Sequence, residues 1–390
     1  MRKTKAVALP PALPIALIGQ KFMGRAHANA WGQAGRFFEL ARRPYVHTAA
    51  ARDARELAAF AARFEIAKTT SDWRTIAEDE EVELVDIATP NDAHAEMSIA
   101  MLAAGKHVAC EKPLAGTLAD ARAMRDAAAQ SKRRTFVWFN YRRCPAIGLA
   151  WQLLRERKLG RIYHVRAQYL QSWGGPETPL SWRFQKKHAG SGAHGDLNAH
   201  LVDLARFLLD DEIVEVHGAV ARTFIAERVA PGTKKKGQSD VDDATLFLAS
   251  FGSGALASFE ATRLATGNLN ANSIEIDGEK GALRFEFERM NELHYYDATT
   301  GPRTAGWTRI VATSAAGNHP YAANWWPDAH MLGYEHGFTN MAADIVRVLT
   351  GEKPVLPLPD FADAYETQRV LEAAMVSARE RCGVAMTSVT

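Results

Sequence analysis

The chain has 390 residues, of which 47% are hydrophobic and 24% are charged, the composition of an ordinary globular protein. Its formal net charge of +2 gives no reason to expect nucleic acid or a membrane surface as a partner. Three cysteines, Cys110, Cys144 and Cys382, are too few and odd in number for a disulfide framework, and they favour a reducing cytoplasm.

The amino-terminal stretch superficially resembles a signal peptide, because residues 1–5 are basic and residues 6–18 are mostly apolar. Three prolines in that run, Pro10, Pro11 and Pro14, break any helix. We therefore expect a short irregular tail followed by a first strand over 14–18. No run reaches the ~18 apolar residues of a transmembrane helix, so we expect none.

A glycine turn follows the first strand and leads into a helical run that continues through Trp31. The order strand, glycine turn, helix points backbone N–H groups at a dinucleotide pyrophosphate. The usual pattern is G-x-G-x-x-G, and Lys21 replaces its middle glycine here, so Lys21 must lean away or lend its own charge. A chance glycine turn is the alternative. The cofactor contacts predicted here are Gly19, Lys21, Phe22, Met23 and Gly24.

The end of the second expected strand, residues 46–51, bears on the type of cofactor. An acid there would hold the ribose 2′-hydroxyl of NAD, and an arginine would accommodate the 2′-phosphate of NADP. The chain has Ala51-Arg52-Asp53, in which Asp53 falls one or two positions late and Arg52 can serve adenine or a phosphate. Both residues are candidate cofactor contacts, with an exposed Arg-Asp pair as the alternative.

Strands and helices continue to alternate up to residue 139. Helices are expected over 55–64, from Ser71, over 94–105 and over 118–130, and strands over 84–89, 107–110 and 135–139. This alternation predicts a doubly wound parallel sheet. Four residues at a strand's carboxyl end are predicted to face the nicotinamide: Thr89, Pro90, Asn91 and His94. For His94, capping of its helix is the alternative.

The tripeptide Glu111-Lys112-Pro113 ends the 107–110 strand, where ligands bind in open α/β sheets. Proline keeps Lys112 out of the α conformation, and a cis Lys112–Pro113 bond would aim the ammonium in one direction. A solvated turn is the alternative. We predict that Glu111 and Lys112 contact the cofactor.

The segments 88–94, 104–108 and 111–114, with the Phe22-Met23-Gly24-Arg25-Ala26-His27 turn, resemble the Gfo/Idh/MocA oxidoreductases. That family includes glucose–fructose oxidoreductase, inositol dehydrogenases and related sugar dehydrogenases. The resemblance covers nearly the whole chain. It implies a Rossmann domain, placed at 1–144, and an α/β domain with a large, mostly antiparallel open sheet for substrate binding and oligomerisation, placed at 145–390.

A glycine loop before a helix over 196–208 carries Asp196 and His200, which are four residues apart and share one helix face. Near the helix N-terminus Asp196 stays ionised, and it can orient an imidazole. The alternative is an N-cap aspartate beside a partly buried histidine. The resemblance implies that Lys112, Asp196 and His200 form the catalytic set.

The remainder reads as a helix over 146–157, a strand over 162–172, and then strands over 214–220, 244–251, 255–262, 273–277, 282–287 and 293–296. Glycine hairpins at 252–254 and 278–281 make their strands antiparallel. The lysines at 234–236 are expected in a solvated loop rather than a nucleic-acid patch. Two helices, 334–349 and 361–381, close the chain.

The loop 318–330 contains two prolines, adjacent tryptophans and two histidines, which suit the apolar face and hydroxyl rim of a sugar ring. The loop looks like that of the levoglucosan-dehydrogenase-like branch of the family. A packing or oligomer-contact loop is the alternative. The predicted substrate contacts are Lys112, Arg183, Asn198, His200, Trp325, Trp326 and His330, and no metal is expected.

Together these features predict reversible hydride transfer between NAD(P) and a secondary hydroxyl of a pyranose sugar, anhydrosugar, glycoside or cyclitol. His200 is the expected base, Lys112 stabilises developing alkoxide charge, and Asp196 orients the pair. NAD is favoured, with NADP left open. A cytoplasmic homodimer or homotetramer is expected. Two rival functions remain: an NAD-dependent glycosidase that oxidises transiently and eliminates, and a non-enzymatic dinucleotide-sensing regulator.

Overall fold

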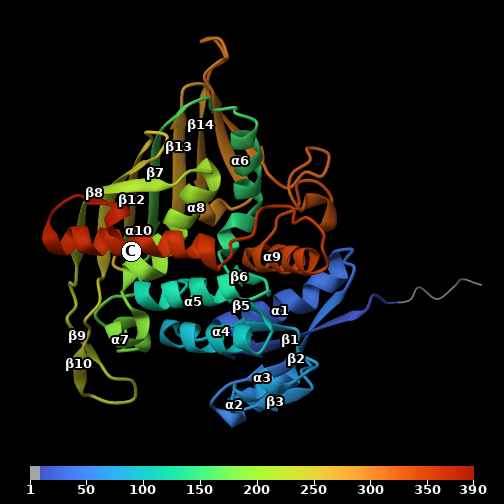
Figure 1. Cartoon of the computed structure of the whole chain (residues 1–390). Coiled ribbons are helices and arrows are strands. Elements are labelled where there is room, and N and C mark those ends of the chain that lie inside the picture. Colours follow the sequence, from blue (N-terminus) through green and yellow to red (C-terminus); the bar gives the residue numbers. More distant parts are fainter. Residues whose placement is uncertain (1–8) are drawn as a thin grey trace, which may run out of the picture.

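The computed structural model describes residues 9–390, so most of the expected irregular tail lies outside the described residues. Two sheets organise the chain: a parallel sheet from its first third (blue to cyan in Figure 1) and a larger sheet from the remainder. Within residues 9–390, no helix is both long and apolar enough to cross a bilayer.

The first sheet has six parallel strands in the order β3-β2-β1-β4-β5-β6. The order reverses between β1 and β4, which places a ligand crevice at the carboxyl ends of these two strands. The central strands are almost entirely buried, as expected for a parallel sheet covered on both faces. The strands are β1 (Ala12–Ile18), β2 (Arg43–Ala50), β3 (Lys68–Thr70), β4 (Leu84–Ile87), β5 (His107–Cys110) and β6 (Thr135–Val137).

Helices cover both faces of this sheet, as the doubly wound prediction requires. The helix expected from Ser71 is only the short α3, because Asp72 accepts the N–H of Arg74 in a turn before it. The short, partly exposed β3 gave no usable pattern and was missed. The helices are α1 (Phe22–Phe37), α2 (Ala54–Arg63), α3 (Thr75–Glu78), α4 (His94–Ala103) and α5 (Leu118–Gln130).

The second sheet has nine strands in the order β16-β15-β14-β13-β7-β12-β11-β8-β17. Both glycine hairpins are antiparallel as predicted, and the pair β7–β12 is the parallel exception. The predicted fold class is therefore confirmed. The strands are β7 (Ile162–Leu170), β8 (Ile213–Arg222), β11 (Ala244–Phe251), β12 (Leu256–Thr262), β13 (Ala271–Gly278), β14 (Gly281–Glu286), β15 (Glu292–Asp297), β16 (Trp307–Val311) and β17 (Val384–Ala385).

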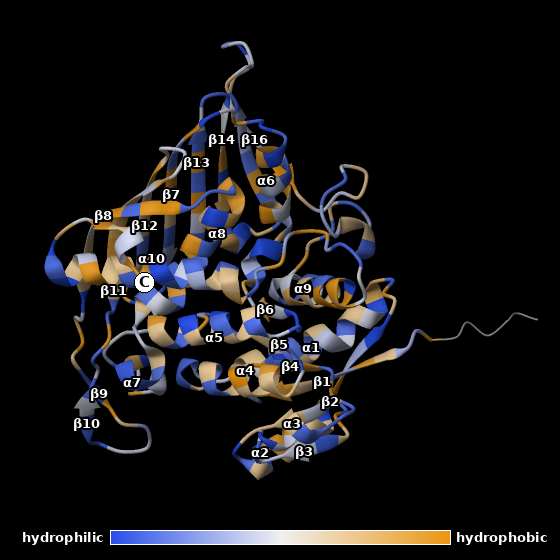
Figure 2. Ribbon diagram, viewed as in Figure 1, coloured by the Kyte–Doolittle hydropathy of each residue, from blue (hydrophilic) through white to orange (hydrophobic). Residues whose placement is uncertain are grey.

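Helices cover one face of this second sheet, and its other face is open. Buried and exposed residues alternate along β7 and β11, and Figure 2 shows the matching alternation of apolar and polar residues along the strands. A small hairpin, β9 (Glu227–Val229) and β10 (Lys236–Gln238), projects from one end, and its lysines are exposed as predicted. The helices are α6 (Pro145–Arg155), α8 (Ala199–Leu209), α9 (Tyr334–Leu349) and α10 (Phe361–Glu380), with a short α7 (Lys186–Ala189).

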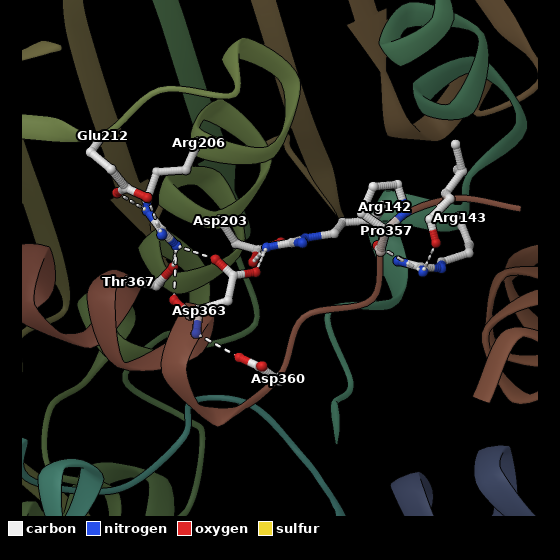
Figure 3. A network of polar contacts seen from close by, with 10 residues as sticks. Arg142, Arg143, Asp203, Arg206, Glu212, Pro357, Asp360, Asp363 and Thr367 are labelled. Carbon is white, nitrogen blue, oxygen red and sulfur yellow. Dashed lines mark hydrogen bonds and ion pairs between the residues drawn. The ribbon is translucent and has the colours of Figure 1, made fainter. Parts of the chain in front are cut away.

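A buried ionic network fixes α8 against the end of the first sheet (Figure 3). Arg142, in the turn after β6, donates to Asp203 of α8 at 2.5 and 2.8 Å and to Asp363 of α10 at 2.6 Å. Arg206 of α8 also pairs with Asp363, at 2.9 Å. Since His200 is the second residue of α8, this network helps to set where that side chain lies.

The carboxyl-terminal helices pack against the first half of the chain, so contacts cross the domain boundary placed between residues 144 and 145. That boundary stays a prediction. Val137 of β6 donates its N–H to the carbonyl of Pro359 at 2.9 Å, and α9 packs along α1. The last segments of the chain thus complete the packing around the first half.

We expect Arg142→Met to lower the free energy of unfolding by about 3–5 kcal/mol, because it leaves the buried Asp203 carboxylate without its partner. The matched control is Arg166→Met. The Arg166 side chain is paired with Glu275 but is itself 53% exposed, so its removal should cost under ~1 kcal/mol. Urea unfolding of both variants measures the difference. Equal losses would contradict the role given to the buried network.

Candidate active site

The glycine turn at the end of β1 is built for close backbone approach. Gly19 has φ of +121°, and a Cβ there would lie 2.4 Å from the carbonyl oxygen of Ala88. A Cβ on Gly24 would lie 2.2 Å from the carbonyl oxygen of Gly19. No side chain caps α1, so its first N–H groups remain available at the switch point. This cradle fits the pyrophosphate of a dinucleotide.

Lys21, which stands where the middle glycine is usual, leans away from the turn. Its ammonium pairs with Glu56 of α2, which also accepts from Gln20 at 3.1 Å. Phe22 and Met23, at the start of α1, face the cleft described below. The sequence therefore departs from the usual glycine pattern without blocking the cradle.

At the end of β2, Asp53 caps α2 by accepting the N–H of Glu56 at 2.9 Å. Arg52 beside it is exposed. Both lie at the expected strand end, and the cap explains why the acid comes late in the sequence. This corner does not by itself separate NAD from NADP.

A cleft of about 250 Å³ opens at the carboxyl ends of β4 and β5 and is lined by both halves of the chain. The first half contributes Thr89, Asn91, Glu111 and Lys112. The second half contributes a larger group, which includes Tyr169, Trp173, Trp182, Arg183, Asp196, His200 and Arg263.

The contact at the centre of the cleft joins Lys112 to Asp196. The Lys112 Nζ lies 2.7 Å from Asp196 Oδ1 and 3.0 Å from its backbone carbonyl oxygen. Arg263 Nη2 donates to the other carboxylate oxygen at 2.9 Å. Burial alone would raise the pKa of Asp196, but the nearby cations outweigh it and hold the pKa well below its ordinary value. Asp196 is therefore ionised.

His200 lies next to this pair but is not bonded to Asp196. The five residues His194–Asn198 form one turn of π-helix before α8. Within it, both carboxylate oxygens of Asp196 are engaged, one by Lys112 and the other by Arg263. The structure thus differs from the expectation that Asp196 orients the imidazole, because Arg263, which was not predicted at this site, takes the second carboxylate oxygen. Single turns of π-helix often occur at functional sites.

The His200 imidazole is neutral at physiological pH. Burial and the charge of Lys112 lower its pKa well below 6.5. The ring packs against Tyr141 with centroids 4.4 Å apart, and its Nδ1 is enclosed without a hydrogen-bond partner among residues 9–390. A neutral imidazole beside an ammonium can accept a proton.

His94 is neither a simple cap nor a cleft residue. It is fully buried, and its ring nitrogens lie 3.0 Å from the carbonyl oxygen of Thr89 and 3.1 Å from that of Pro113. Burial lowers the pKa of His94, so the neutral ring has one N–H and donates to one of these two carbonyls, while it packs between the loops that carry Thr89 and Lys112. Asn91 donates to the carbonyl of Ala189 at 3.0 Å, and the Lys112–Pro113 peptide is cis.

Four of the predicted substrate contacts lie outside the cleft lining. Asn198 donates to His194 Nδ1 at 3.0 Å, in the interior. Trp325 packs on Phe37 and donates to Asn340 at 2.9 Å, Trp326 packs on Phe37, and His330 lies against the backbone of its own loop. The arrangement therefore does not support substrate contact by Asn198, Trp325, Trp326 or His330.

The predicted Arg183 does line the cleft, together with aromatic residues that were not among the predicted contacts. Trp173 and Trp182 line the cleft with Tyr141 and Tyr169, and the guanidinium of Arg183 lies 4.4 Å over the Trp182 ring. Arg263 follows directly after β12 and is buried. In the sequence, the closeness of Trp173 and Trp182 to Arg183 was the signal that could have indicated an aromatic cleft lining.

Comparison with known proteins agrees with this geometry. Residues 13–139 match the oxidoreductase family with an NAD-binding Rossmann fold, and residues 148–284 match the GFO/IDH/MocA C-terminal domain. Levoglucosan dehydrogenase of Pseudarthrobacter phenanthrenivorans is 41% identical over 95% of this chain and 97% of its own length.

Two solved structures are similar over almost the whole chain. An oxidoreductase domain protein from Kribbella flavida has a TM-score of 0.92 and 51% identity, covering 96% of this chain and 99% of that one. A levoglucosan dehydrogenase in complex with NADH and levoglucosan has a TM-score of 0.91 and 40% identity, with the same coverage.

We expect Gly24→Ala to raise the dissociation constant for NADH about tenfold or more, because its Cβ collides with the carbonyl of Gly19. Gly32→Ala is the matched control in the same helix, since a Cβ there meets nothing within 4 Å. NADH fluorescence titration measures both. Unchanged affinity in Gly24→Ala would show that the cofactor does not use this turn.

Proposed function

The chain belongs to the Gfo/Idh/MocA family of oxidoreductases, and on that premise we propose that it oxidises a secondary hydroxyl of a sugar or anhydrosugar with NAD. The observation that carries the proposal is the meeting of Lys112, Asp196 and His200 in one cleft beside the glycine turn. An anhydrosugar is our first choice, because the similar levoglucosan dehydrogenases act on one by name.

The glycine turn at Gly19 and Gly24 would hold NAD at the start of α1, and the cofactor would supply the acceptor for the hydride on the carbon that carries the reacting hydroxyl. The Lys112 ammonium donates a hydrogen bond to that oxygen and stabilises the negative charge that develops on it. His200, neutral and facing the same space, takes the hydroxyl proton. Asp196 holds the ammonium in place by accepting its hydrogen bonds at Oδ1 and at the backbone carbonyl.

The wall opposite Lys112 suits a polyhydroxylated ring. Trp173 Nε1 donates to Gln171 at 2.6 Å, and Gln171 donates to Asn270 at 2.7 Å, which also accepts from Tyr169 at 2.8 Å. These bonds fix the aromatic rings and leave polar edges beside them. Apolar faces with ordered polar groups are what a sugar ring requires.

We propose NAD rather than NADP as the working cofactor, since the matching family is NAD-binding. Because an exposed arginine such as Arg52 can accommodate the 2′-phosphate of NADP, the activity should be compared with both cofactors. The three free cysteines, of which two are buried, support a reducing cytoplasm as the compartment.

The test is a panel of anhydrosugars, monosaccharides, glycosides and inositols, assayed by absorbance of reduced nicotinamide with NAD and with NADP. The proposal predicts that reduced cofactor accumulates with at least one free sugar or anhydrosugar. Release of an aglycone without net reduced cofactor would instead identify a redox-type glycosidase. Tight cofactor binding without turnover of any member would favour a regulator.

With the substrate in hand, Lys112→Ala should lower kcat by ~10² or more, because both the donor to the alkoxide and the partner of Asp196 are lost. Its dissociation constant for NADH should change little. Lys132→Ala, at an exposed lysine of the same domain, is the control. A Lys112→Ala enzyme that turns over at the wild-type rate would remove this lysine from the mechanism.

We further propose that the open face of the large sheet packs on a second copy, giving a homodimer or homotetramer. Leu246, Leu248 and Val220 are 46%, 57% and 52% exposed there, beside a hollow of about 970 Å³. Neighbouring exposed apolar side chains in a hollow of a sheet face fit a protein–protein contact.

Leu248→Glu should therefore shift the protein towards monomer in size-exclusion chromatography with light scattering, because it buries a charge in the interface. Leu269→Glu, at an exposed loop position with 77% exposure, should leave the assembly unchanged. A wild-type protein that is already monomeric at micromolar concentration would contradict the proposal.

A further inference from the structure

Beneath the cleft lies a fully enclosed polar group that the proposed reaction does not use. It contains His27 of α1, Asp86 of β4 and Glu111 after β5, which are respectively 0%, 0% and 4% exposed. These residues come from three distant parts of the sequence. Rings of Trp138 and Phe338 lie 4.2 and 5.6 Å from the His27 ring and exclude water.

Asp86 is the anchor of this group. Its two carboxylate oxygens accept the indole N–H of Trp31 at 2.7 Å and of Trp138 at 2.8 Å. The same two oxygens both lie 3.1 Å from His27 Nδ1. These contacts hold the Asp86 side chain in one orientation.

His27 connects this anchor to the cleft. Its Nε2 lies 3.0 Å from Glu111 Oε1, so each ring nitrogen faces a carboxylate and each carries a hydrogen. Burial alone would lower the pKa of His27, but Asp86 and Glu111 raise it to about 9. Asp86 and Glu111 are the titratable residues whose side chains hydrogen-bond to the ring within residues 9–390.

Glu111 connects His27 to the backbone of Lys112. Its Oε2 accepts the backbone N–H of Lys112 at 3.1 Å. On the far side of Lys112, the carbonyl of Pro113 is held by His94. The turn thus has polar contacts on both sides, and in this position the Lys112 ammonium reaches Asp196.

We propose that His27 and Asp86 are positioning residues, which hold Glu111 and through it the Lys112 turn so that the lysine ammonium is delivered to the cleft. Enclosing two carboxylates and an imidazole costs several kcal/mol in desolvation, and an apolar set of similar volume would often be at least as stable. Such a cost is consistent with a group retained for orientation. The proposal rests on the proposed function only in its kinetic arm.

The kinetic arm is the pH profile of kcat/KM. His27 is protonated below about pH 9 in the folded protein, so wild-type activity should fall as pH rises through that value, when Nε2 ceases to donate to Glu111. Asp86→Asn removes the main charge that keeps His27 protonated. Its alkaline fall should therefore move to lower pH by about one unit or more.

Glu111→Gln serves as the second variant if Asp86→Asn does not fold, and it should move the fall in the same direction. Glu96→Gln, at an exposed glutamate paired with Arg74 on the same domain, should leave the fall in place. A uniform loss of activity with no movement of the fall would mean a purely structural role and would overturn the proposal.

The structural arm needs no substrate and stays informative if no sugar is oxidised. In a crystal structure of His27→Gln, the Lys112 Nζ should lie beyond hydrogen-bond reach of Asp196. An intact contact in that variant would overturn the positioning role, whatever the outcome for the proposed function.

Discussion

The ion pair between Lys112 and Asp196 is the interaction on which this structure depends. It joins the loop after β5 to the π-helical turn before α8, and so links the two halves of the chain at one point. Both side chains are largely withdrawn from water, at 14% and 26% exposure, so the pair is stronger than a surface salt bridge but demands accurate placement. Arg263 engages the second oxygen of Asp196, and burial together with the charge of Lys112 lowers the pKa of the nearby His200 imidazole.

Two enclosed ionic groups flank this pair and account for its placement. Arg142, Asp203 and Asp363 secure α8 and therefore the Asp196–His200 side (Figure 3), and His27, Asp86 and Glu111 secure the Lys112 side. Each group pays a desolvation cost that an apolar core would avoid. The shared consequence is geometric: two halves of the chain, each held rigidly, bring an ammonium, a carboxylate and an imidazole to one cleft.

Much of the fold could be predicted because it depends on local pattern. The strand at 107–110, the helix at 118–130 and both glycine hairpins come from short-range periodicity and turn chemistry, and they match the structure. The convergence of Lys112, Asp196 and His200 came from resemblance rather than spacing. Arg263 and the true place of Trp325 could not be predicted, since one depends on strand register across the sheet and the other on packing against α1. Composition indicated an aromatic sugar loop at 318–330, and tertiary packing put Trp173 and Trp182 in the cleft instead.

The most direct measurement is a crystal structure of the protein with NADH and a sugar or anhydrosugar that it oxidises. The account predicts one substrate oxygen within about 3 Å of both Lys112 Nζ and the cleft-facing nitrogen of His200, with the nicotinamide against the carbon that bears it. A sugar bound instead at the Trp325 loop, or a reacting oxygen beyond the reach of Lys112, would contradict it.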